Sequence, residues 1–276
     1  MVAEKKDRYG GVMRPKSDGR CIHCREVLVN ATGDHVFPSS WYPDVTPPNI
    51  QRWKAPSCKR CNGQFGAMEQ DLLVRFGLCI DPRKAGASGI SKKALSALGI
   101  GVSGLSEKEM QIRKALRDKI LGKSKIYDKA AEPHLIPGLG PHAGFPVETQ
   151  RQIEIPADEV YAVAKKILRG CEYWLAEGRI VEPPYELEVF NVSETPKELE
   201  AHLKFGPDYL GPGCRIRRAV PVDEPGAAIY EITIWDTWKL FFSILPPETA
   251  AIREDRGVGI AEPEAETERD GRSKKN

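Results

Sequence analysis

Apolar residues recur at helical spacing in two long stretches of this 276-residue chain. The stronger amphipathic pattern lies over residues 157–177 and predicts a helix with one buried face. A weaker pattern predicts a helix over 61–76, through Phe65, Met68, Leu72, Leu73 and Phe76. Ser106 and Glu109 form a capping-box sequence, which predicts a third, basic helix that ends near Leu121.

Runs of β-branched and aromatic residues predict strands in both halves of the chain. In the first half these runs are short and lie at 27–29 and 33–38. In the second half they cover 185–192, 214–222, 227–234 and 238–245. Helices and strands in separate stretches predict an α+β fold.

Changes in composition divide the chain into five predicted regions. A small cysteine-bearing module at 20–80 is expected to precede a separate α+β domain at 131–249, whose role the sequence does not reveal. The remaining three are a flexible N-terminus (1–19), a basic linker or helical arm (81–130) and a disordered tail (250–276).

Charge is distributed unevenly, although the formal net charge is only +2. Residues 1–130 hold 24 Lys and Arg against 13 Asp and Glu, whereas residues 131–276 hold 17 against 26. A basic region attracts polyanions through its field and through counterion release, so the first half favours a nucleic-acid partner. A merely solvated surface is the alternative, and the basic helix around 107–125 is open to both interpretations.

Four of the seven cysteines form two C-x2-C knuckles, Cys21–Cys24 and Cys58–Cys61, separated by 33 residues. Two knuckles supply the four thiolates of a tetrahedral zinc site, so the sequence predicts structural Zn²⁺. The polar N-terminus and the lack of an 18-residue apolar run predict a cytoplasmic protein without a membrane partner, in which disulfides are disfavoured. The isolated Cys79, Cys171 and Cys214 are expected to be buried as small hydrophobes.

The segment between the knuckles resembles the HNH endonuclease family. The resemblance lies in Asp34-His35-Val36-Phe37-Pro38 and in Cys58-Lys59-Arg60-Cys61-Asn62, and it covers residues 20–76. It implies a zinc-stabilised ββα-metal (HNH) nuclease module, which we expect to run strand, strand, loop, knuckle, helix. The last His of the family name is replaced here by Asn62, a common variant in the family.

The resemblance also implies roles for individual residues. His35 would be the general base that deprotonates water, while Asp34 and Asn62 would hold one catalytic divalent cation, Mg²⁺ or Mn²⁺. Asn49 would be the middle residue of the motif, although Gln51 is an alternative because the stretch from Asn49 to Cys58 is longer than expected.

Two further polar residues near the motif have less definite roles. Glu69 follows Asn62 by two helical turns and can face the metal, but a solvated carboxylate is the favoured interpretation. His23, inside the first knuckle, is expected to face solvent rather than to bind metal.

Basic and aromatic side chains surround the motif in sequence. We expect phosphates to be bound by Arg52, Lys54, Lys59 and Arg60. Loop aromatics Trp41, Tyr42 and Trp53 are expected to pack over a small core, with stacking on bases as the alternative.

The sequence therefore favours a metal-dependent endonuclease that hydrolyses phosphodiester bonds of nucleic acid, with double-stranded DNA as the favoured partner. The first alternative is a non-catalytic, zinc-stabilised module that binds nucleic acid. The second is a regulated protein whose acidic C-terminal part covers a basic nuclease surface. A homodimer is left open.

Overall fold

The computed structural model describes residues 14–126, 128, 146, 149–191, 197, 203–205, 210–224 and 226–246. Within these residues the chain is α+β, as predicted, with three antiparallel sheets and four α-helices. The predicted tail, most of the predicted N-terminus and most of the Pro-rich stretch after residue 130 lie outside the described residues.

The N-terminal unit is a hairpin that packs against a long helix. Strand β1 (Thr32–His35) pairs with β2 (Lys54–Ser57), and helix α1 (Lys59–Cys79) follows directly. The 3₁₀ turn η1 (Ser39–Trp41) lies in the long loop between the strands. The hairpin, the loop and the helix together form a ββα unit.

The order of strands in this unit corrects the prediction. No strand forms over 27–29, where Val27 makes only an isolated bridge to Arg20 and Val29 is 92% exposed. The segment predicted as the second strand, 33–38, overlaps β1, and β2 was not predicted. Pro56 and the short length conceal β2 in the sequence, and its paired residues lie 19 to 25 positions earlier in the chain.

Two shorter helices extend α1 on one side. Helix α2 (Ile90–Ala97) approaches α1 closely, since a Cβ on Gly77 would lie 2.7 Å from the Ala94 methyl group. Helix α3 (Glu107–Leu121) begins at the predicted capping box, in which Ser106 and Glu109 bond each other's backbone N–H groups. Its one buried residue, Ile120, packs with Val74 and Leu98 in a small separate cluster. Most of α3 is therefore solvated.

The second half contributes a helix and a larger sheet. Helix α4 (Ala157–Leu175) matches the strongest amphipathic pattern in the sequence. The four predicted strands are present, and the sheet order is β5 (Glu186–Asn191), β9 (Trp238–Leu245), β8 (Ala228–Ile234), β7 (Cys214–Ala219) and β6 (Lys204–Phe205). A two-stranded ribbon, β3 (Lys125–Ile126) with β4 (Arg151–Gln152), precedes α4.

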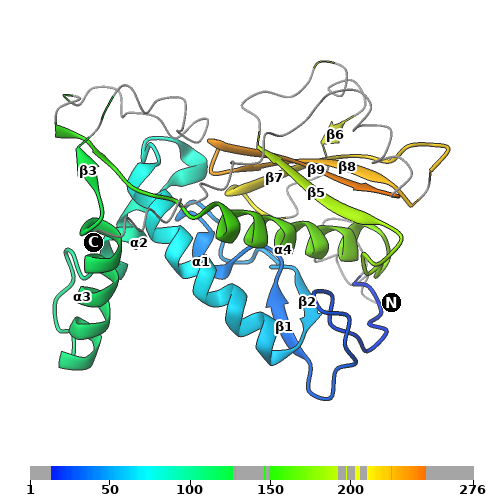
Figure 1. Cartoon of the computed structure of the whole chain (residues 1–276), viewed down its shortest axis with the longest axis horizontal. Coiled ribbons are helices and arrows are strands. Elements are labelled where there is room, and N and C mark those ends of the chain that lie inside the picture. Colours follow the sequence, from blue (N-terminus) through cyan, green and yellow to red (C-terminus); the bar gives the residue numbers. More distant parts are fainter. Residues whose placement is uncertain are drawn as a thin grey trace, which may run out of the picture.

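Helix α4 lies between the five-stranded sheet and the ββα unit, and it contacts α1, β2 and β5 (Figure 1). One hydrophobic cluster extends from Ile22 to Ile244 and includes residues of both predicted domains. Trp235 packs 4.9 Å from Trp41 and donates its indole N–H to the Trp41 carbonyl. The division into two domains stays a prediction, but residues on both sides of position 130 share one core.

The loop aromatics and isolated cysteines belong to this core. Trp41, Tyr42 and Trp53 are almost completely buried, and Trp53 stacks on Trp174 at 4.9 Å. This burial confirms the packing interpretation of the loop aromatics. Cys171 and Cys214 are buried, as predicted, whereas Cys79 is only partly buried where it packs against the core. None of the described helices combines the length and the hydrophobicity that a bilayer crossing requires.

Candidate functional site

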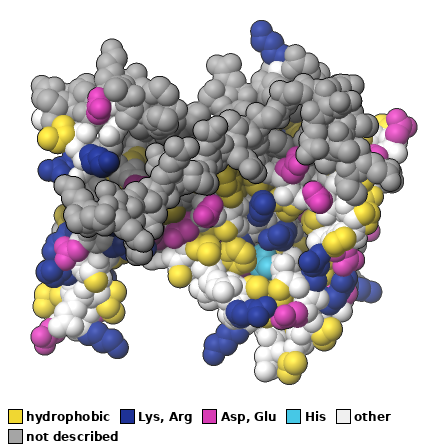
Figure 2. Space-filling view, viewed as in Figure 1, with side chains coloured by type: hydrophobic (Ala, Val, Ile, Leu, Met, Phe, Trp, Pro, Cys, Tyr) yellow, Lys and Arg dark blue, Asp and Glu magenta, His cyan; other side chains and the backbone are white. Residues whose placement is uncertain are grey.

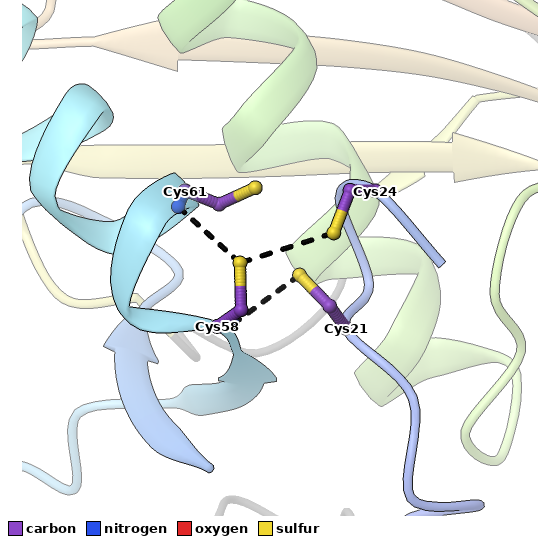
Figure 3. A group of neighbouring side chains, drawn as sticks. All are labelled: Cys21, Cys24, Cys58 and Cys61. Atoms are coloured by element: carbon purple, nitrogen blue, oxygen red, sulfur yellow. Dashed lines mark hydrogen bonds between the residues drawn. The ribbon is translucent and has the colours of Figure 1, made fainter. Parts of the chain in front are cut away.

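The four knuckle cysteines converge as the sequence predicts. The sulfur atoms of Cys21, Cys24, Cys58 and Cys61 all lie within 4.8 Å of one another, and those of Cys24 and Cys58 are 3.8 Å apart (Figure 3). A zinc–sulfur bond of about 2.3 Å places the sulfurs of a tetrahedral site about 3.8 Å apart. The cluster can therefore hold a zinc ion.

Backbone geometry orients these thiols. The first knuckle closes through a hydrogen bond from Cys21 N to the Glu26 carbonyl, with Arg25 in the left-handed region at φ 66°. The second knuckle forms the start of α1, where the Cys58 sulfur accepts the N–H of Cys61. Burial opposes ionisation of Cys21, but backbone N–H groups of Cys24 and Cys58 lower its pKa to about 7. Burial raises the pKa of Cys24 and of Cys61, so Cys21 is the thiol that the backbone favours as a thiolate. The knuckles thus join the N-terminal loop to the helix through four converging thiols.

Asp34 lies on the buried face of β1, beside this cluster. One carboxylate oxygen, Oδ2, is 3.0 Å from Nε2 of His23, and the other, Oδ1, is 3.2 Å from Nζ of Lys166. Burial raises the pKa of Asp34, but the hydrogen bond from His23 and the charge of Lys166 outweigh it, so the pKa lies below the ordinary value. Asp34 is therefore an ionised, internally paired carboxylate.

Lys166 reaches this position from α4 and is only 1% exposed. Its ammonium lies 2.8 Å from Oε1 of Glu69 and donates hydrogen bonds to the carbonyls of His35 and Val36. A side chain from the second predicted domain thus lies at the centre of the candidate site. No motif in the sequence indicated it.

The structure corrects the expectations for Glu69 and His23. The Glu69 side chain is 14% exposed rather than solvated, and burial raises its pKa despite the charge of Lys166. The His23 side chain is 3% exposed, and its ring packs 4.7 Å from that of Phe65. Burial lowers the pKa of His23 against the influence of Asp34. Both predictions were wrong because α4 and the knuckle cover this end of the ββα unit.

His35 occupies the other face of the hairpin. It pairs with the exposed Lys54, whereas Asp34 pairs with the buried Ala55, and alternation along the strand directs the two neighbours to opposite faces. The half-buried imidazole makes no hydrogen bond or ion pair to the described part of the chain. Burial, followed by the charges of Lys54, Lys166 and Arg52, lowers the pKa of His35. The imidazole is therefore neutral at pH 7.

The two asparagines lie apart from each other. Asn62, on α1, donates its amide N–H to the hydroxyl of Thr32 at 3.2 Å, on the same face of β1 as Asp34. Asn49 is exposed in the loop before β2, and no hydrogen bond links it to His35 among the described residues. Gln51, its alternative, is half-buried in the same loop.

The four predicted phosphate-binding residues are all exposed. Arg52 lies over the Tyr42 ring at 4.5 Å and Arg60 pairs with Glu26 at 3.2 Å. Figure 2 shows basic side chains around a histidine that reaches the surface. A hollow of about 400 Å³ beside the hairpin is lined in part by Arg14, Gly33 and Lys54, and His35 is not among its lining residues. Basic side chains therefore line a concave surface next to the hairpin.

No family model, no curated protein and no solved structure matches this chain. Function must therefore be argued from the residues themselves. Two polar clusters carry that argument: the four cysteines, and the group of Asp34, His23, Lys166 and Glu69 with His35 on the opposite side of the strand.

Proposed function

We propose that this protein is a metal-dependent endonuclease of the HNH type that hydrolyses phosphodiester bonds, with double-stranded DNA as the favoured substrate. The observation that carries the proposal is the position of His35. Its imidazole is half-buried and free of hydrogen bonds to the described residues, and it lies across the hairpin from the exposed Lys54. That hairpin belongs to a ββα unit joined at its ends by four thiols.

The chain's own residues supply two parts of the reaction. Neutral His35 accepts a proton from water, because its lowered pKa leaves the ring nitrogen unprotonated at pH 7. Lys54 and Arg52, whose charges act on His35, neutralise the substrate phosphates. Lys59 and Arg60, exposed at the start of α1, supply further positive charge for phosphate contacts.

The proposal includes one Mg²⁺ or Mn²⁺ held by Asp34 and Asn62. When bound, a hard divalent cation neutralises the phosphate and stabilises the leaving oxygen. The donor chemistry fits, since carboxylate and amide oxygens are suitable ligands and the Asn62 amide nitrogen is turned to Thr32. Asp34, however, already pairs with Lys166 and His23, so a divalent cation has to compete for this carboxylate.

A second candidate is the non-catalytic, zinc-stabilised module that binds nucleic acid. Two observations favour it: both Asp34 oxygens have protein partners, and Asp34 and His35 lie on opposite faces of β1. This candidate predicts salt-sensitive binding of DNA without cleavage by any divalent metal.

Cleavage of plasmid DNA separates the two candidates. Zinc-loaded full-length protein with Mg²⁺ or Mn²⁺ should nick or linearise the plasmid, and His35→Ala should reduce the rate by about 100-fold, as expected for loss of a general base. Lys92→Ala, an exposed change on α2, is the matched control and should cut at the wild-type rate. Equal cutting by His35→Ala and wild type would remove His35 from the reaction, and binding without cutting would favour the second candidate.

A further inference from the structure

The side chain of Lys166 lies between β1 and α1 and pairs with Asp34, the carboxylate assigned to the proposed cation. Its ammonium contacts one carboxylate on each element, Asp34 on β1 at 3.2 Å and Glu69 on α1 at 2.8 Å. A divalent metal bound at this place would also be a cation that bridges two buried carboxylates. In this structure the bridging cation is the Lys166 ammonium.

The main chain around Lys166 is closely packed. A Cβ on Gly170 would lie 2.7 Å from the side chain of Val36, and Trp174 donates its indole N–H to the Lys54 carbonyl at 3.0 Å. Helix α4 therefore lies directly against the hairpin one turn and two turns beyond Lys166. Because α4 is packed and hydrogen-bonded to the hairpin on this side, we expect the lysine side chain rather than the helix to move when the carboxylates are released.

The charges favour competition between the lysine and a metal. Asp34 and Glu69 bring two negative charges into a buried space, and Lys166 neutralises one of them. Without the ammonium, two neighbouring buried carboxylates would be uncompensated and would attract a divalent cation strongly. With the ammonium in place, the net charge of the three groups is −1 instead of −2, and the ammonium repels a second cation. Both effects weaken the attraction of the cluster for a divalent cation.

We propose that Lys166 is an internal cation that competes with the divalent metal for Asp34 and for the negative charge of the neighbouring Glu69, and that it thereby sets the metal affinity of the site formed by Asp34 and Asn62. This inference rests on the proposed function, since it concerns the cation assigned there to Asp34. It gives the second half of the chain a role in the candidate site. Lys166 lies on α4, so a helix of the predicted 131–249 domain would control the access of metal to the ββα unit.

Direct binding of Mn²⁺ tests the competition. The affinity of zinc-loaded full-length protein for Mn²⁺ is measured by the paramagnetic resonance signal of free Mn²⁺, with zinc content checked in every sample. Removing the ammonium in Lys166→Met should tighten Mn²⁺ binding by about tenfold or more. The additional change Asp34→Asn should abolish the gain. Lys165→Met, on the same helix without a carboxylate partner among the described residues, should leave the affinity unchanged.

A second variant keeps the test valid if Lys166→Met does not fold. Lys166→Gln also removes the charge but retains a donor for the carbonyls of His35 and Val36, and it should tighten Mn²⁺ binding in the same direction. Equal Mn²⁺ affinity in the wild type and in the folded charge-removing variant would overturn the proposal. So would a gain that survives Asp34→Asn, because the metal would then bind elsewhere.

The result is separable from the plasmid assay. If no variant cuts DNA but removal of the ammonium tightens Mn²⁺ binding through Asp34, the competition stands and the nuclease proposal fails. If wild type cuts through His35 and its Mn²⁺ affinity equals that of Lys166→Met, the nuclease stands and the competition fails.

Discussion

Two polar clusters meet at His23, and they differ in how the chain assembles them. The four cysteines come from two short knuckles within the first quarter of the chain, and their sulfurs lie within 4.8 Å of one another. The second cluster joins β1, α1 and α4, and 131 residues separate Lys166 from His35, whose carbonyl it contacts. The first cluster can be recognised in the sequence by the C-x2-C spacing of its cysteines, whereas the second forms only when distant segments pack together.

His23 also links the two clusters physically. It lies between two zinc-type ligands in the chain, and its Nε2 contacts Asp34 at 3.0 Å. Loss of the metal would therefore loosen the first knuckle and, with it, the contact of His23 with Asp34. The four predictions below test the comparison, from the largest expected effect to the smallest.

The largest effect is expected from breaking the cysteine cluster. Cys61→Ser should lose the bound metal, about one Zn²⁺ per chain, and unfold the ββα unit, because a structural zinc contributes about 10 kcal/mol or more to such units. Metal analysis and circular dichroism measure the two losses. Cys79→Ala, outside the knuckles, should retain its zinc. A folded Cys61→Ser protein without zinc would show that the cluster is not what holds the unit together.

A smaller loss is expected from breaking the second cluster. Asp34→Asn leaves the buried Lys166 with one carboxylate instead of two and should cost about 3 kcal/mol of unfolding free energy, as for other broken buried ion pairs. Urea denaturation at neutral pH measures this cost. The matched control is Asp118→Asn, which breaks an exposed pair with Lys114 and should have no measurable effect. Equal effects of the two changes would show that the Asp34 cluster is not a buried network.

The pH dependence of stability should distinguish the two carboxylates that share Lys166. Glu69 has a raised pKa in the folded state, so folding binds protons and the contribution of Glu69 to stability falls as pH rises from about 4.5 through its folded pKa. Asp34 has a lowered pKa, so its contribution is present above about 3.9 and is lost as pH falls through its folded pKa. The two contributions therefore have opposite signs.

Glu69→Gln isolates the first of these effects. Unfolding free energies of wild type and Glu69→Gln are compared between pH 4.5 and 7.5, and the difference, wild type minus variant, should decrease as pH rises. The zinc cluster is common to both proteins, so its own pH dependence cancels in the difference. A difference that increases with pH would assign Glu69 a lowered pKa and contradict its place in the buried cluster.

The smallest effect is expected at the surface, outside both clusters. Lys59→Ala removes one exposed charge at the start of α1 and should weaken DNA binding severalfold, with a salt slope that is smaller by about 0.9 for one lost phosphate contact. Binding measured over a range of salt concentrations gives this slope. Lys92→Ala should change neither affinity nor slope, and an equal change in both variants would indicate non-specific attraction.

Much of the fold followed from local patterns. Helix α4 and four of the five strands of the larger sheet lie where they were predicted, because a buried face imposes its period on the sequence over many residues, whereas the two-residue strand β6 was not predicted. The capping box of α3 needs only Ser106 and Glu109. Strand β2 was missed because four residues with a proline carry too little pattern, and its pairing is decided by β1 across a long loop.

The candidate site divides in the same way. The sequence by itself determined the four cysteines, since two tight knuckles bring their own thiols together wherever the chain folds around them. Only the tertiary structure decided that His23 and Glu69 are buried and that Lys166 bridges Asp34 and Glu69. The physical reason is that burial and charge pairing depend on which distant helix covers a surface, and α4 is held over the ββα unit by packing that no short sequence pattern encodes.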